Sequence, residues 1–127
     1  MAIKKLPKLT TMRNKADGLL TPIIKKMYPT CLLNAKNCTI QTQVAHHHVH
    51  KGASTRLRYE LDNLIPLCNH CHLALHMQEG EHASTIVTIK GADWFRGLQK
   101  KKQELVKADV HYYIQNYNRL KDIYEKS

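Results

Sequence analysis

The chain lacks any apolar run that approaches the length of a membrane-spanning helix. Its N-terminal residues do not place a long hydrophobic core before a small-residue cleavage site, so we predict no signal peptide. Both absences favour the cytoplasm, where thiols stay reduced. The four cysteines are then better explained by metal binding than by disulfide bonds.

Acidic residues are scarce relative to basic ones. Lys and Arg number 20 against 10 Asp and Glu, which gives a formal charge of +10 with neutral histidines. Residues 1–30 carry seven basic side chains and one acid, residues 31–89 four of each, and residues 90–127 nine against five. A neutral centre between basic flanks predicts an anionic partner, nucleic acid first, although a merely soluble basic protein has a similar balance.

Internal repeats and low-complexity tracts are also absent, and 127 residues make one small domain. A hydrophobic core of that size is modest, and a structural metal is one way to reinforce it. We divide the domain 1–127 into a basic N-terminal arm and helix (1–30), a central metal-binding segment (31–80) and a basic helical extension (81–127).

The hydrophobic pattern predicts helices in both flanks. Residues 1–12 are typical of a loose basic arm, whereas residues 14–27 repeat apolar side chains with helical spacing. Pro22 either kinks this helix or starts a second one with Thr21 as its N-cap. Further helices are predicted near 93–107 and 109–125. Their apolar stripe favours packing within the chain over a dimer seam; it comprises Val106, Val110, Tyr113, Tyr117, Leu120 and Tyr124.

The central segment is predicted to hold two short extended pieces and a helix. Residues 46–50 follow a β-prone stretch and should form a strand, residues 63–67 form the second extended piece, and the loop between them is polar. A helix is expected from His70 to about Met77, ending near Gly80. Residues 84–90 suit either a strand or an amphipathic helix.

The four cysteines form two pairs, Cys31 with Cys38 and Cys68 with Cys71. Four thiolates close a tetrahedral Zn²⁺ site, and the two-residue gap in the second pair is a usual zinc spacing. The gap in the first pair is wider, so ordinary buried thiols are the alternative there. The pattern predicts a structural zinc.

Histidines cluster in the same segment, with seven of the nine between Cys31 and His76. His72 and His76 are four residues apart on a predicted helix, so their side chains share a face and can bind one cation. The run 46–48 can supply a third ligand and a general base. Three protein ligands leave positions for water or phosphate, as a hydrolytic metal requires. Ordinary surface or core roles are preferred for His50, His70, His82 and His111.

These motifs resemble those of HNH endonucleases with the ββα-metal fold, in their zinc-stapled form. The resemblance is carried by His46-His47, by Asn63 and by Cys68-x-x-Cys71-His72-x-x-x-His76. It is closer to small phage HNH proteins and to the recombination nucleases of lambda-like phages. Their Gly-Ala-Ser-like, Leu-Arg-Tyr/Phe and Asp-Asn elements are matched at 52–54, 57–59 and 62–63. The match covers residues 31–76, and the flanks match only in being basic and helical.

The resemblance implies an α+β protein whose ββα-metal core holds a structural zinc between N-terminal and C-terminal helices. His47 would be the general base, and Asn63 would brace the loop that holds it. A catalytic divalent ion such as Mg²⁺, Mn²⁺ or Ni²⁺ would be held by His46, His72 and His76, and the zinc by Cys31, Cys38, Cys68 and Cys71. Sliding the frame makes His47 the ligand and His48 the base; the first frame is preferred because it matches residues 47–72 without a gap.

The expected function is a metal-dependent DNA endonuclease of phage or prophage type, which hydrolyses phosphodiester bonds to 5′-phosphate and 3′-hydroxyl ends. The DNA backbone would be held by Lys51, Arg56, Arg58 and the lysines of both flanks, with a solvated loop as the alternative for the arginines. Recombination junctions, duplexes and packaging sites all stay open as substrates, and a junction resolver would act as a homodimer. The alternative function is a non-catalytic zinc-bound DNA-binding module, whereas zinc sequestration is disfavoured by the basic flanks.

Overall fold

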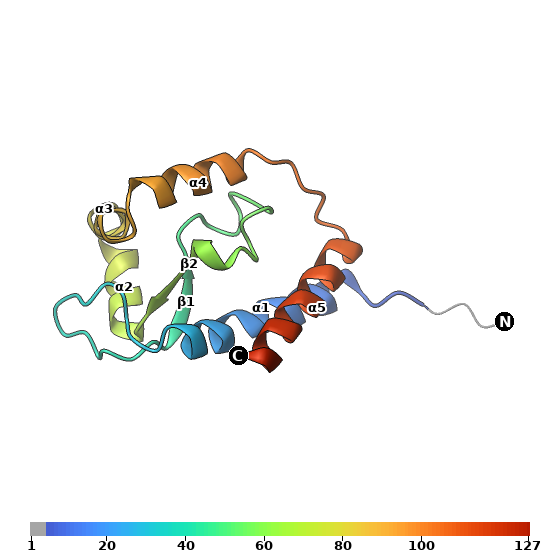
Figure 1. Ribbon diagram of the computed structural model, residues 1–127, viewed down its shortest axis with the longest axis horizontal. Helices are drawn as coiled ribbons and strands as arrows, with labels where there is room; N and C mark the ends of the chain where they lie inside the picture. Colours follow the sequence, from blue (N-terminus) through green and yellow to red (C-terminus); the bar gives the residue numbers. More distant parts are fainter. Residues whose placement is uncertain (1–4) are drawn as a thin grey trace.

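Helices surround a short antiparallel sheet in the computed structural model, which describes residues 5–127 (Figure 1). Along these residues the order is α1 (Leu9–Met27), β1 (Val44–His47), a 3₁₀ turn (Leu61–Asn63), β2 (Leu64–Leu67), α2 (Asn69–Met77), α3 (Glu79–Lys90), α4 (Ala92–Lys102) and α5 (Val110–Lys126). The predicted α+β class is confirmed. In this part of the chain, every helix is too short or too polar to cross a membrane.

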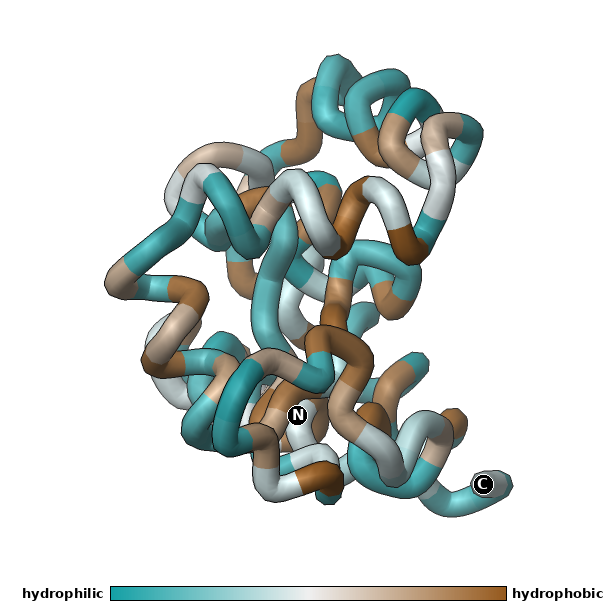
Figure 2. The backbone as a smooth tube through the Cα atoms, turned by 90° about the vertical axis from the view of Figure 1, so that its left-hand side faces the viewer, coloured by the Kyte–Doolittle hydropathy of each residue, from teal (hydrophilic) through white to brown (hydrophobic). Residues whose placement is uncertain are grey.

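The first and last helices, α1 and α5, pack side by side (Figure 1). α1 buries Leu20 and Ile24 in a core that also contains Tyr113 and Leu120 of α5. Burial of each such aliphatic side chain contributes about 1.5–3 kcal/mol. Hydrophobic and hydrophilic residues alternate along the helices in Figure 2, as expected of amphipathic helices. The part of the predicted apolar stripe that lies on α5 therefore packs within the chain, whereas Val106 lies in the loop between α4, which ends at Lys102 and not near residue 107, and α5.

Helix α1 is longer and more continuous than predicted. It begins at Leu9, within the stretch predicted to be a loose arm, of which residues 1–4 lie outside the described residues. It also continues through Pro22. Thr21 caps no second helix, because its hydroxyl oxygen accepts a hydrogen bond from the Ala45 N–H at 3.3 Å. Burial of the helix face outweighs the one hydrogen bond that proline removes.

The two strands form a hairpin-like pair whose second strand is entirely buried. His46 lies opposite Ile65 and His47 opposite Leu64 in the antiparallel register. The pair packs against α1 on one side and α2 on the other. Because successive side chains of a strand point to opposite faces, His46 and His47 are directed toward different helices.

Helices α3 and α4 follow α2 almost without interruption. Gly80 lies inside α3 instead of ending the preceding helix, and residues 84–90, left open between strand and helix, are helical. Gly91 separates α3 from α4 with a φ of +101°, a conformation that glycine adopts readily. The Trp94 indole N–H of α4 donates to the Asp62 carbonyl at 2.8 Å, which fixes α4 against the turn before β2.

Candidate metal centres

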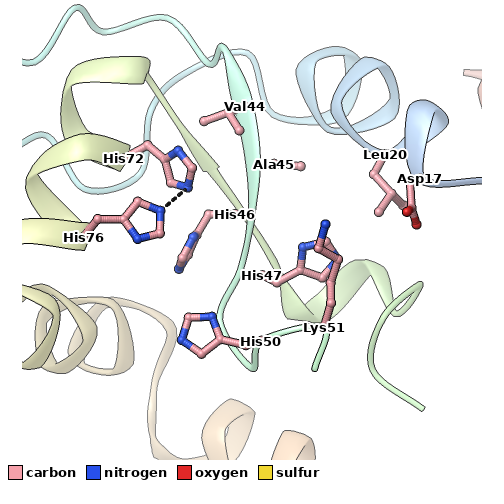
Figure 3. Close-up of a pocket in the computed structure, with 10 residues that line it drawn as sticks. All are labelled: Asp17, Leu20, Val44, Ala45, His46, His47, His50, Lys51, His72 and His76. Atoms are coloured by element: carbon pink, nitrogen blue, oxygen red, sulfur yellow. Dashed lines mark hydrogen bonds between the residues drawn. The ribbon is translucent and has the colours of Figure 1, made fainter. Parts of the chain in front are cut away.

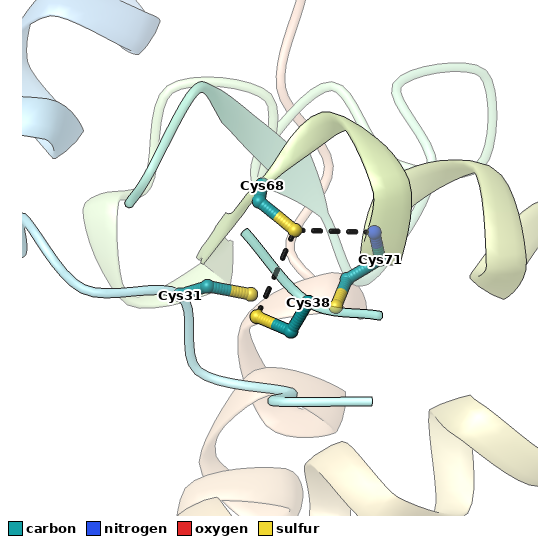
Figure 4. Close-up of side chains that lie close together, drawn as sticks. All are labelled: Cys31, Cys38, Cys68 and Cys71. Carbon is teal, nitrogen blue, oxygen red and sulfur yellow. Dashed lines mark hydrogen bonds between the residues drawn. The ribbon is translucent and has the colours of Figure 1, made fainter. Parts of the chain in front are cut away.

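The four cysteines come together at the start of α2 (Figure 4). Their Sγ atoms all lie within 4.8 Å of one another. Cys38 Sγ and Cys68 Sγ are 3.8 Å apart. Two sulfurs of a tetrahedral zinc site are also about 3.8 Å apart when each Zn–S distance is about 2.3 Å. Because Cys31, Cys68 and Cys71 are buried, the residues fit a closed structural zinc site.

The turn between Cys31 and Cys38 shows how the wide spacing is accommodated. Asn34 and Asn37 adopt positive φ angles of 48° and 66°, which asparagine tolerates. Ile40 has a φ of 73°, which is rare for a β-branched residue. Its N–H donates to Cys38 Sγ at 3.2 Å, so the turn directs a backbone donor at a sulfur.

Cys68 is the thiol with the clearest tendency to ionise. Burial raises its pKa, but the Cys71 N–H and the groups of Thr39 that donate to its sulfur lower it to about 6. Hydrogen bonds to a thiolate stabilise the charged form, which is the form that binds zinc. Cys68 is also the N-cap of α2, so the helix begins at the metal site.

His46 of β1 meets His72 and His76 of α2 in a cleft of about 350 Å³ (Figure 3). One ring nitrogen from each lies within 4.8 Å of the others, and the Nε2 atoms of His72 and His76 are 3.1 Å apart. Two imidazoles bound to one ion at about 2.1 Å place their nitrogens about 3 Å apart at bond angles near 90°. The set therefore fits one cation. His46 is buried and His76 exposed, so this site opens toward solvent.

The environment favours neutral imidazoles at this cleft. Burial, followed by the neighbouring His72 and His76, lowers the pKa of His46 to about 3. Burial and His76 also lower the pKa of His72. A metal binds the neutral imidazole, so both residues are in the ligating form at neutral pH.

His47 lines the same cleft but is directed away from the three converging histidines, toward Asp17 (Figure 3). Its Nε2 lies 2.9 Å from the carbonyl oxygen of Arg58. Because a carbonyl only accepts, Nε2 carries the proton and Nδ1 of the neutral ring keeps a lone pair. Burial lowers the pKa of His47 below its usual 6.5, so the ring is neutral at pH 7.

Asn63 is fully buried and bonded only to backbone groups. Its Oδ1 accepts from the Val49 N–H at 2.8 Å, and its Nδ2 donates to the carbonyls of Val49 at 3.0 Å and Leu57 at 3.2 Å. The amide therefore holds the residues that follow His47 against the loop that contains Arg58.

The neighbouring histidines differ in position. His48 packs against Trp94, with ring centroids 5.0 Å apart, and lines a separate depression with Phe95. His50, for which an ordinary role was preferred, lines the cleft and has its Nε2 2.8 Å from Glu79 Oε1. The geometry thus agrees with the frame in which His47, not His48, lies beside the metal ligands. The sequence did not predict the contact of His50 with Glu79, because the two residues are 29 positions apart.

The two loop arginines are occupied by carboxylates of the protein. Arg56 contacts Glu60 at 2.9 Å and Glu104 at 2.7 Å, and Arg58 contacts Asp17 at 2.6 Å. Two of the five N–H donors of each guanidinium are used internally, and the charge of each is paired with a carboxylate of the protein. Lys51, in contrast, lines the cleft.

Comparisons with family models, curated proteins and solved structures give no match. The site is therefore interpreted from its own chemistry. One set of donors is sulfur, buried and closed; the other is imidazole, partly exposed and open, with a further neutral imidazole beside it. A metal with open positions next to a base is the arrangement that hydrolytic reactions use.

Proposed function

We propose that the protein is a metal-dependent DNA endonuclease of the HNH, or ββα-metal, type. The observation that carries this proposal is the convergence of His46, His72 and His76 in the cleft that His47 also lines. The order strand, strand and helix, with two of the ligands on the helix, agrees with the resemblance seen in the sequence. The four cysteines would hold a structural zinc.

In this proposal His47 is the general base. Its neutral Nδ1 accepts the proton of the attacking water, while Nε2 stays bonded to the Arg58 carbonyl. Asn63 keeps the segment after His47 in place through its backbone hydrogen bonds. His46, His72 and His76 would hold a divalent cation, which would supply Lewis-acid chemistry for the scissile phosphate and the leaving oxygen.

The donor set bears on which cation the site prefers. Three neutral imidazoles without a carboxylate suit transition ions such as Ni²⁺ or Zn²⁺, whereas Mg²⁺ prefers oxygen ligands. We therefore expect Ni²⁺ to support cleavage better than Mg²⁺. Such a preference would not alter the role of His47.

DNA is the proposed substrate because of the charge distribution. The formal charge is +10, and the basic excess lies on both sides of the neutral central segment. Lys51, at the cleft, would contact the phosphate next to the scissile bond. Arg56 and Arg58 are already paired with carboxylates of the protein, so we assign the phosphate contact at the cleft first to Lys51. Binding of this kind is insensitive to sequence and weakens with salt.

A nicking assay on supercoiled plasmid with added Mg²⁺, Mn²⁺ or Ni²⁺ tests the proposal. His47→Ala should lower the cleavage rate by about 10²–10⁴-fold while zinc content and DNA binding stay unchanged. His111→Ala, at an exposed histidine of α5, is the matched control and should cleave normally. Wild-type protein that binds DNA but never cleaves with any of these ions would refute the enzyme and favour the non-catalytic zinc-bound DNA-binding module.

The form of DNA is tested separately. A four-way junction and a linear duplex of matched sequence, compared at equal concentration, report whether the enzyme prefers recombination intermediates. Faster cleavage of the junction would support a role in recombination, and equal rates would contradict it. Sedimentation of the protein with each substrate shows whether it acts as a homodimer.

A further inference from the structure

Asp17 is the one acidic residue among the first 30, and it lies on the face of α1 that borders the cleft (Figure 3). Its carboxylate accepts three hydrogen bonds from residues 41 and 42 positions away. Arg58 donates from Nε to Oδ1 at 3.0 Å and from Nη2 to Oδ2 at 2.6 Å. The hydroxyl of Tyr59 donates to Oδ1 at 2.8 Å. Asp17 and Arg58 therefore form a bidentate ion pair, and the hydroxyl of Tyr59 adds a third hydrogen bond to the same carboxylate.

Arg58, which Asp17 binds through its side chain, also contacts the His47 ring through its backbone carbonyl. Within residues 5–127, this is the only hydrogen bond of that ring. The carbonyl oxygen of Arg58 accepts from His47 Nε2 at 2.9 Å. A fixed guanidinium and a fixed tyrosine leave the backbone between them little freedom to rotate. The carbonyl that orients His47 is thus held from α1, across the hairpin.

The charges agree with a permanent contact. Burial alone would raise the pKa of Asp17, but the hydrogen bonds from Arg58 and Tyr59 outweigh it and lower this pKa, so the carboxylate is ionised at neutral pH. The hydrogen bonds from Arg58 to Asp17 raise the pKa of Arg58, and burial with Asp17 raises that of Tyr59. Each donor therefore keeps its proton.

We propose that Asp17 is a positioning residue, which holds Arg58 and Tyr59 so that the Arg58 carbonyl keeps His47 in the Nε2–H tautomer, with Nδ1 ready to accept a proton. This inference rests on the proposed function and goes beyond it, because it assigns the orientation of the base to a carboxylate on the N-terminal helix. Asp17 does not contact substrate or metal in this account. A role limited to fastening α1 to the loop is the competing explanation.

Asp17→Asn is the first test, since asparagine keeps the shape but offers one acceptor where Arg58 needs two. Glu60→Gln is the matched control, because Glu60 also pairs with a loop arginine, Arg56, and with Lys101, but has no connection to His47. Asp17→Asn should lower kcat by about 10–100-fold with an unchanged KM for DNA and unchanged metal content. Glu60→Gln should stay within about twofold of wild type. A folded Asp17→Asn protein with normal kcat would overturn the proposal.

A spectroscopic measurement distinguishes a role of Asp17 in orienting His47 from a role limited to attaching α1 to the loop. ¹⁵N chemical shifts of the His47 ring report which nitrogen carries the proton, and we expect the Nε2–H tautomer in wild type and a mixture in Asp17→Asn. An unchanged tautomer in the variant would overturn the proposal. If wild-type protein never cleaves DNA, the proposed function fails, yet this measurement still decides whether Asp17 orients His47.

A double variant tests whether Asp17 acts through His47. In His47→Ala protein, with imidazole added to restore part of the cleavage, Asp17→Asn should cause no further loss because the ring it positions is absent. An additive loss would show that Asp17 acts elsewhere. Should Asp17→Asn fail to fold, Tyr59→Phe keeps the Arg58–Asp17 pair and removes the 2.8 Å hydrogen bond to Asp17 together with the 3.5 Å one to the Arg13 carbonyl. It should shift the tautomer in the same direction, and no shift would again overturn the proposal.

Discussion

The two candidate metal centres share helix α2 but differ in burial and in donor chemistry. At the start of the helix, Cys68 and Cys71 are fully buried and meet the sulfurs of Cys31 and Cys38 from the segment between α1 and β1. One turn further on, His72 is half-buried and His76 exposed, and both face a cleft. A closed sulfur site suits a permanent structural ion, whereas an open imidazole site leaves room for a substrate. If the proposed function holds, one short helix separates a stabilising role from a reactive one, and each of the following substitutions or measurements alters one side of this contrast.

The largest effect is expected from the buried site. Cys68→Ala removes a zinc ligand that is also the N-cap of α2, so both the ion and the helix start are lost. We expect loss of bound zinc and of cooperative thermal unfolding, measured by metal analysis and calorimetry. Ser84→Ala, at an exposed position of α3, is the control. A Cys68→Ala protein that stays folded without zinc would contradict the structural role.

Substitution in the histidine cluster should affect metal affinity and leave the fold intact. His76→Ala removes an exposed ligand, so the fold and the sulfur-bound zinc should persist while affinity for the exchangeable divalent ion falls by at least about tenfold. Isothermal titration with Mn²⁺ or Ni²⁺ measures the affinity. His82→Ala, on α3, should bind as wild type does. Loss of zinc from His76→Ala would mean that the two centres are not independent.

Asn63→Ala tests the link between the hairpin and the loop. It leaves the Val49 N–H and the Val49 carbonyl without their partners in a fully buried place and removes one of the two hydrogen bonds to the Leu57 carbonyl, which costs about 3 kcal/mol of unfolding free energy. Urea denaturation at constant zinc concentration measures the loss. Asn69→Ala, at an exposed residue, should change stability by less than about 0.5 kcal/mol. Equal stabilities of the two variants would contradict the bracing role.

The pH dependence of cleavage tests the environment of His47. The base works in its unprotonated form, and burial lowers its pKa below 6.5, so the acid limb of the profile must move to lower pH. At saturating metal, kcat/KM should be nearly constant from pH 8 to about 6.5 and should fall only below that value. An acid limb centred above pH 6.5 would argue against His47 as the base.

The smallest effect is expected at Ile40. Its positive φ is unfavourable for a β-branched residue, and its side chain is 63% exposed, so little burial is lost on replacement. Ile40→Asn should raise the unfolding free energy by about 1 kcal/mol, because asparagine tolerates this conformation. A thermal melt with zinc bound measures the change. A lower melting temperature would show that the isoleucine side chain stabilises the turn.

The two residue pairs on α2 that belong to the candidate metal centres were predictable because their spacing is local. Cys68 and Cys71 are three residues apart and His72 and His76 four apart, and these spacings place side chains together on one turn of a helix. The α+β class followed equally from helical flanks around extended pieces. That His46 would join His72 and His76 depended on the resemblance, since a strand and a helix contribute them separately.

Long-range pairing was not predictable. Thr21 looked like an N-cap, but its hydroxyl binds the backbone of β1, and α1 continues through Pro22 because its face is buried against α5. Gly80 looked like a helix end, but Gly91 is the residue with the positive φ. Arg58 was expected at the DNA backbone, and only the folded chain brings it to Asp17. Local patterns contain no information on a partner 41 residues away.

Anomalous diffraction from crystals grown with Mn²⁺, recorded on both sides of the zinc edge and at a wavelength sensitive to manganese, tests the contrast most directly. Two separate ions are predicted: zinc among the sulfurs of Cys31, Cys38, Cys68 and Cys71, and manganese among the ring nitrogens of His46, His72 and His76. A cleft without any ion at saturating Mn²⁺, or one ion shared between sulfur and imidazole, would contradict the account.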